Sequence, residues 1–134
     1  MIVFIDTNVL ISSFINIEST PFKAIAKTFF FPYFGVTSDY CLEEFYSVIE
    51  YKFPNREQEM KKRLLEYLPM LNLITTSNDA YDIEQQLRDY KDRLVLRAAL
   101  QIDADIMITG DKDLLDLSIT KPKIITPREF VNNY

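Results

Sequence analysis

The stretch IVFIDTNVL, residues 2–10, decides the fold of this chain. Its first four residues, Ile2–Ile5, are apolar at every position, which is typical of a central parallel strand that is buried on both faces. Asp6 ends this strand. In open parallel α/β sheets the functional crevice lies at the carboxyl ends of the strands. The opening residues therefore predict a buried strand that delivers a carboxylate to such a crevice.

Farther along the chain, short apolar runs alternate with helical patterns, without any internal repeat or linker. This alternation predicts one α/β domain over residues 1–134, with a Rossmann-like central parallel sheet. The last helix is signalled by the capping box Thr126-Pro127-Arg128-Glu129, and Ser38 is placed to cap a helix. The helix over 55–68 is expected to turn Met60, Leu64, Leu65 and Leu68 inward. The predicted strands are 2–5, 35–37, 71–75, 105–109 and 123–125, and the predicted helices are 8–14, 20–30, 39–50, 55–68, 78–90 and 92–102.

Composition excludes several kinds of chemistry. The chain has 134 residues and no His, which excludes imidazole acid–base catalysis and His-ligated metals. It has one Cys, so a Cys-cluster metal site is impossible, and two Gly, too few for a Gly-rich phosphate loop. The net charge of −5 argues against binding polyanions by bulk charge. Carboxylates, hydroxyls and amides remain, and they favour a hard metal ion.

The first residues show no targeting signal. No basic segment precedes the apolar run, and Asp6 interrupts it. No apolar stretch reaches the ~18 residues of a membrane span. We therefore expect a soluble, cytoplasmic protein with no membrane contact.

Carboxylates from separate elements are expected to meet at one edge of the sheet. Asp6 ends the first strand and Asp111 ends the fourth, so both point into one crevice if these strands are neighbours. Glu44 lies at the edge of the apolar stripe of the helix 39–50, and Asp92 shares a side with the apolar residues of the helix 92–102. Asp113 is close enough in sequence to reach the same region. A Mg²⁺ or Mn²⁺ ion is the usual way to hold such a group of like charges.

Two blocks of this sequence resemble the PIN-domain ribonucleases. The first is Phe4-Ile5-Asp6-Thr7-Asn8-Val9-Leu10, and the second is DRLVLRAALQIDADIMITGDKDLL, residues 92–115. Glu44, in the sequence CLEEF, lies where the family places its second acid. The ending, residues 124–130, resembles a bacterial and archaeal branch described as toxin components of toxin–antitoxin pairs. The likeness covers essentially the whole chain.

The resemblance implies a Rossmann-like three-layer α/β/α PIN domain and Mg²⁺- or Mn²⁺-dependent hydrolysis of RNA phosphodiesters, as in VapC-type toxins. It also implies an antitoxin partner. Tyr90-Lys91 depart from the family pattern, in which Pro and an acid precede the helix acid, so Asp89 becomes a candidate outer acid. By the same resemblance, Asp6, Glu44, Asp92 and Asp111 are the metal-binding catalytic acids, Asp113 is an accessory ligand, and Thr7, Asn8 and Thr109 orient the acids or water through hydrogen bonds.

RNA affinity would have to come from the rim of this acidic site. Two basic segments are candidates, residues 52–63 and residues 88–97, and the second is nearer the predicted site. It carries Arg97 among its cations, and Lys112 lies between two of the site acids. The cations we expect to contact RNA are Arg88, Lys91, Arg93 and Lys112.

Two further features are first interpreted as structural. Cys41 is expected to be a small core residue. The aromatic run Phe29-Phe30-Phe31, with Tyr33-Phe34, is expected to pack in the core, although an exposed part of it would suit a protein partner. Small PIN relatives commonly form homodimers, so the resemblance implies a homodimer here.

Two other functions compete with a nuclease. Asp6-Thr7-Asn8-Val9 and Gly110-Asp111 mimic motifs of haloacid-dehalogenase-like phosphatases, but Asn8 stands where that chemistry needs a second Asp as general acid. A non-catalytic PIN-like module that binds RNA or a protein partner is the second alternative. A receiver-type phosphoacceptor is a third idea, for which the central phosphorylated Asp cannot be located.

Overall fold

Five parallel strands form one sheet in the computed structural model, which describes residues 1–134. The strand order is β3-β2-β1-β4-β5. The first strand therefore occupies the centre, as its all-apolar sequence predicts. Each predicted strand lies within one residue of an observed one at both ends. The strands are β1 (Ile2–Ile5), β2 (Phe34–Ser38), β3 (Asn72–Ile74), β4 (Ile106–Ile108) and β5 (Lys123–Ile125).

The position of β1 between β2 and β4 determines where the candidate site lies. Ile5 is in register with Ile108 of β4, and the main-chain N–H of Asp6 donates to the carbonyl of Ile108 at 3.1 Å. The first and fourth strands are thus neighbours, which confirms the expected pairing. The residues that follow them, Asp6 and Thr109, are both buried at the carboxyl edge of the sheet.

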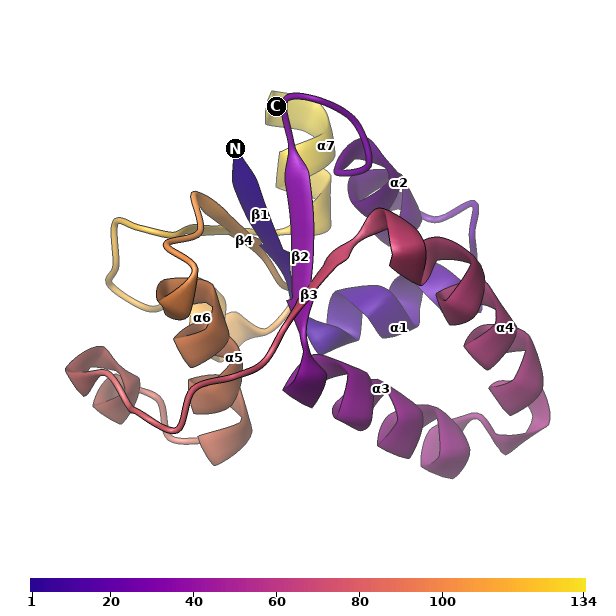
Figure 1. Ribbon diagram of the computed structural model, residues 1–134, viewed down its shortest axis with the longest axis horizontal. Helices are drawn as coiled ribbons and strands as arrows, with labels where there is room; N and C mark the ends of the chain where they lie inside the picture. Colours follow the sequence, from indigo (N-terminus) through magenta and orange to yellow (C-terminus); the bar gives the residue numbers. More distant parts are fainter.

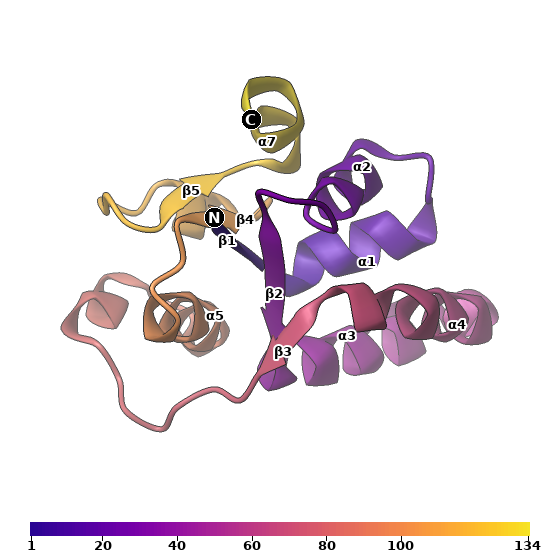
Figure 2. The same cartoon turned by 45° about the horizontal axis from the view of Figure 1, so that its top comes forward.

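Helices cover both faces of the sheet and make three layers. On one side lie α1, α2, α3, α4 and α7, while α5 lies on the other side (Figures 1 and 2). A short helix, α6, follows β4 directly. The helices are α1 (Thr7–Ile15), α2 (Thr20–Lys27), α3 (Asp39–Lys52), α4 (Glu57–Tyr67), α5 (Tyr90–Gln101), α6 (Lys112–Leu115) and α7 (Pro127–Asn133), and the 3₁₀ helices are η1 (Pro54–Arg56), η2 (Leu68–Met70) and η3 (Asp82–Gln86).

The predicted helix caps are confirmed. The Ser38 side chain accepts a hydrogen bond from the N–H of Cys41 at the start of α3. Thr126 accepts from the N–H of Glu129 and donates to its carboxylate at the start of α7. Such caps satisfy main-chain donors that the first turn leaves without partners.

The predicted helix over residues 78–90 is wrong. Only η3 is helical there, and Leu87 is extended. Side chains supply local partners that compete with a helix: Ser77 accepts from the N–H of Asp79, and Asp89 accepts from the N–H of Lys91 to cap α5. As a result α5 starts at Tyr90, two residues earlier than expected.

Several burial expectations also need correction. Leu65 of α4 is exposed, because the buried stripe of this helix runs through Met60 and Leu64. The aromatic run is only partly core: Phe30 and Phe31 are exposed, while Phe29 packs against the core. Cys41 is fully buried, as expected. No helix of the chain combines the length and the apolar character that a bilayer crossing requires.

Candidate metal centre

Asp6 is a buried carboxylate that is held by three hydrogen bonds. It caps α1 by accepting the N–H of Thr7 at 2.6 Å on Oδ1. Its other oxygen, Oδ2, accepts from Asn8 Nδ2 at 2.8 Å and from Thr109 Oγ1 at 2.7 Å. Burial raises the pKa of Asp6 to about 6, and the hydrogen bonds from Thr109 and Thr7 oppose that rise. Asp6 is therefore fixed in orientation but is electrostatically uncompensated.

Thr109 and Asn8 tie the ends of β1 and β4 together. Besides donating to Asp6, Thr109 Oγ1 accepts the N–H of Asp111 at 3.0 Å. Asn8 Oδ1 accepts the N–H of Gly110 at 3.0 Å. Both side chains thus form hydrogen bonds with Asp6 and with the main chain that follows β4. Thr7 binds Asp6 only through its main-chain N–H, because its buried hydroxyl has no hydrogen-bond partner.

Asp92, Asp111 and Asp113 form a close group of acids. One carboxylate oxygen from each lies within 4.8 Å of the other two. Asp111 caps α6 by accepting the N–H of Asp113 at 2.8 Å. Asp92 lies in the first turn of α5, where burial and then the negative charges of Asp111 and Asp89 raise its pKa to about 7. The candidate outer acid, Asp89, thus lies near the group but serves as the cap of α5.

Glu44 approaches the group from α3. Its charge raises the pKa of Asp6, and Tyr40 Oη donates a 2.9 Å hydrogen bond to its Oε2. Glu44 lies outside the group of three acids whose oxygens are within 4.8 Å of one another. The four expected acids therefore meet at one edge of the sheet, with Glu44 at the periphery and Tyr40 as a partner that the sequence did not indicate.

The donor set fits a hard divalent cation. All the candidate ligands are carboxylate oxygens, and no Lys or Arg forms an ion pair with Asp6, Glu44, Asp92 or Asp111. Opposite ligands of Mg²⁺ lie about 4.2 Å apart, because each Mg–O bond is about 2.1 Å long. The oxygens of Asp92, Asp111 and Asp113 lie within 4.8 Å of one another, a limit that is compatible with ligands of one such ion. Asp6 and Glu44 would complete the acidic wall of the site.

The basic residues divide into two groups. Arg88 is 92% exposed, with its nearest acid, Asp113, at 3.9 Å, and Lys91 and Lys112 are also exposed. The Nε of Arg93, in contrast, donates to the carbonyl of Leu87 at 2.7 Å, so this side chain also fastens the loop before α5.

Arg97 is not part of an RNA-binding face. It is buried and pairs with the buried carboxylate of Glu84 at 2.8 Å, and it also donates to the carbonyl of Ser77. The pairing fastens η3 to α5, and it lowers the pKa of Glu84. Arg97 lies inside the apolar run LVLRAAL, and this position in the sequence indicates that it is buried. Nothing in the sequence indicates that Glu84 is its partner.

The fold and the acidic cluster define a class of open α/β domains with a candidate metal site at the carboxyl edge of a parallel sheet. The chain belongs to the PIN domain family, whose sequence profile matches residues 2–113. No curated protein matches the chain.

Solved structures share the fold. A chain of VapBC2 from Rickettsia felis, crystallised with a DNA fragment from the promoter, superposes with a TM-score of 0.69 at 17% identity, over 94% of this chain and 97% of that one. VapC20 of Mycobacterium tuberculosis, described as a Sarcin-Ricin loop cleaving toxin, superposes with a TM-score of 0.59 at 14% identity, over 90% and 99% of the two chains. The predicted PIN fold is therefore confirmed.

Proposed function

We propose that this protein is a divalent-metal-dependent endoribonuclease that hydrolyses RNA phosphodiester bonds, and that it is the toxin of a type II toxin–antitoxin pair. One observation carries the proposal: Asp6, Asp92 and Asp111, from β1, α5 and the end of β4, gather without a cationic partner. Membership of the PIN domain family and structural similarity to VapC20, described as a Sarcin-Ricin loop cleaving toxin, support the substrate class.

The acids would have different tasks in the reaction. Asp92, Asp111 and Asp113 would hold Mg²⁺ or Mn²⁺, with Asp6 and Glu44 completing the acidic wall. When bound, such an ion supplies an acidified water and neutralises charge on the phosphate. In the metal-free protein, burial and the charges of Asp111 and Asp89 raise the pKa of Asp92 to about 7, and a bound cation would favour the charged form of this carboxyl.

Exposed cations would position the RNA. Arg88, Lys91 and Lys112 are exposed basic side chains that lie close to the acids in the sequence, and Arg93 would add to them only with its remaining guanidinium N–H groups. They would contact phosphates rather than bases, because Lys and Arg at a rim set register along the backbone.

A protein partner is supported by the exposed aromatic residues. Phe30, Phe31 and Phe34 are 67%, 95% and 59% exposed, which is unusual for phenylalanine in a lone monomer. We propose that an antitoxin or a second copy of the chain covers this surface. Light scattering of the purified chain tests the homodimer, and Phe31→Ser should then shift it toward the monomer.

The nuclease proposal is tested by cleavage of single-stranded and looped RNAs with Mg²⁺, with Mn²⁺, and with EDTA. Asp111→Asn should reduce cleavage by several orders of magnitude while the circular dichroism spectrum stays unchanged. Glu66→Gln, at an exposed acid of α4 without an ion pair, is the matched control. Parent-rate cleavage by Asp111→Asn would contradict the proposal.

The same samples test the alternatives. Turnover of a small phosphoester without RNA cleavage would favour the phosphatase. The hydrogen bonds of Asn8 argue against it, since its amide is committed to Asp6 and Gly110 and offers no acidic proton. Metal-independent RNA binding without turnover would favour the non-catalytic module.

A further inference from the structure

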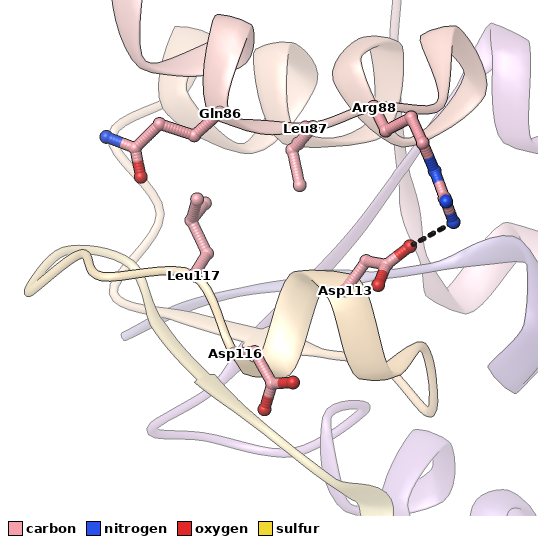
Figure 3. A pocket seen from close by; sticks show the side chains of 6 residues that line it. All are labelled: Gln86, Leu87, Arg88, Asp113, Asp116 and Leu117. Atoms are coloured by element: carbon pink, nitrogen blue, oxygen red, sulfur yellow. Dashed lines mark ion pairs between the residues drawn. The ribbon is translucent and has the colours of Figure 1, made fainter.

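A cavity of about 450 Å³ lies beside the acidic cluster, between η3 and α6. Its volume falls within the usual range of small-ligand sites. Figure 3 shows its lining: Leu87 and Leu117 face one another, and polar side chains surround them. Asp113 belongs both to this lining and to the group of three acids. A ligand in the cavity would therefore sit next to the proposed site of cleavage.

The lining disfavours a phosphate and an aliphatic ligand. The lining holds two carboxylates, Asp113 and Asp116, and a single guanidinium, that of Arg88, which lies 3.9 Å from Asp113. The local charge is thus negative, and a phosphate would be repelled. Four of the six lining residues are polar, so an aliphatic ligand would leave them without partners. A planar, uncharged group with apolar faces and N–H donors at its edge suits both the leucines and the acids.

We infer that this cavity is a nucleobase pocket, and that it takes an unpaired guanine of the RNA. This inference rests on the proposed function. Unpaired bases are recognised by hydrogen bonds to their Watson–Crick edges. Guanine is the base that presents two adjacent donors there, N1–H and the N2 amino group, and these match the two oxygens of one carboxylate. Asp116 accepts no hydrogen bond and forms no ion pair through its side chain, so both oxygens are free.

The other lining groups complete this assignment. The half-buried Leu117 can contact a flat face of the ring, whereas Leu87 is 2% exposed and forms part of the wall of the pocket. Arg88 has a planar guanidinium that can stack on the base or reach its phosphate. The ion pair between Arg97 of α5 and Glu84 of η3 holds this wall of the pocket in place.

The test measures mononucleotide binding to the full chain by ¹H–¹⁵N NMR in EDTA, where no cleavage takes place. GMP, IMP, AMP, CMP and UMP share the ribose phosphate, and IMP differs from GMP only by lacking the N2 amino group. GMP should shift the amide signals of Leu87, Asp116 and Leu117 at millimolar concentration. IMP should bind at least about fivefold more weakly, the lower end of the effect of one paired base contact.

Asp116→Asn should remove the preference for GMP over IMP, because an amide offers one acceptor in place of two. Glu66→Gln should keep it. Equal shifts with all five nucleotides, no shift with any of them, or an unchanged preference in Asp116→Asn would overturn the inference. The two proposals fail separately: a GMP preference without metal-dependent cleavage sinks the nuclease alone, and Asp111-dependent cleavage without a GMP preference sinks the pocket alone.

Discussion

Thr109 Oγ1 donates a 2.7 Å hydrogen bond to Oδ2 of Asp6, although 103 positions separate the two residues in the sequence. The same hydroxyl accepts the N–H of Asp111 at 3.0 Å. One buried side chain thus orients the acid that follows β1 and the main chain of Asp111, three residues after the end of β4. It also lowers the pKa of Asp6, against the effect of burial.

Thr109→Val should therefore reduce both the rate of RNA cleavage and the free energy of unfolding. The methyl group keeps the volume but removes the donor to Asp6, which should cost about 1–3 kcal/mol of unfolding free energy. Cleavage should fall by roughly 10–100-fold. The loss of cleavage rate at low pH should begin at a higher pH, because Asp6 loses a hydrogen bond that stabilises its charged form. Thr109→Ser, which retains the hydroxyl, should restore most of the rate. Equal rates for the two variants would contradict this role.

The metal-free protein should lose stability as the pH rises from about 4 to about 7. Unfolded aspartates ionise near pH 4, whereas burial holds the pKa of Asp6 at about 6 and that of Asp92 at about 7. In this window the folded chain binds more protons than the unfolded chain, so the free energy of unfolding falls with pH. The fall due to Asp6 should be on the order of 2–3 kcal/mol. Urea titrations in EDTA at several pH values measure it.

Asp92→Asn should flatten that dependence and stabilise the metal-free protein at neutral pH. The amide removes a charge that Asp111 and Asp89 repel. The same change should reduce the increase in thermal midpoint on adding Mg²⁺ or Mn²⁺, because a ligand is lost. Glu66→Gln supplies the reference curves. A variant that is less stable than the parent in EDTA at pH 7 would show that the repulsion is unimportant.

Arg97→Met should be among the most destabilising single changes outside the core. It leaves the carboxylate of Glu84, 3% exposed, without its partner, which typically costs about 3–5 kcal/mol. The matched control is Lys61→Met, which breaks a 2.9 Å pair with Glu57 and a 3.1 Å pair with Glu50, all with side chains at least about one-third exposed. Such a pair contributes roughly 1 kcal/mol or less. Chemical denaturation of both variants should show this difference, and equal losses would disprove the distinction.

The exposed cations should act through salt-dependent RNA affinity. Replacing Arg88, Lys91 or Lys112 by Ala should each lower the slope of log affinity against log salt by about 0.7 if the cation contacts a phosphate of single-stranded RNA. Lys62→Ala, an exposed cation of α4, should leave the slope unchanged. RNA binding to Asp111→Asn without metal measures these slopes without cleavage, and unchanged slopes would place the RNA elsewhere.

The sheet and the positions of the strand-end acids could be predicted because buried parallel strands are almost wholly apolar. Ile2–Ile5 is such a run, and an acid that follows it must lie at the carboxyl edge of the sheet. Because Asp6 and Asp111 both follow parallel strands, they are expected at the same edge of the sheet. The PIN resemblance added roles for Thr7, Asn8 and Thr109 that spacing alone does not give.

Tertiary contacts decided the rest. The segment 78–90 has enough polar and apolar residues for a helix, but Glu84 is drawn inward by Arg97, and Asp89 starts α5. Leu65 is apolar, yet it lies about 100° around the helix from Leu64 and faces solvent. A residue-by-residue pattern cannot show which partner a charge will find across the fold.

The strand order has a consequence for how the protein is made. β1 is synthesised first but lies at the centre of the sheet, and its neighbour on one side, β4, comes a hundred residues later. A nascent chain on the ribosome therefore carries Asp6 without Asp111 until the segment that follows β4 has been synthesised. Any activity that depends on both acids is withheld from the growing chain until β4 has paired with β1.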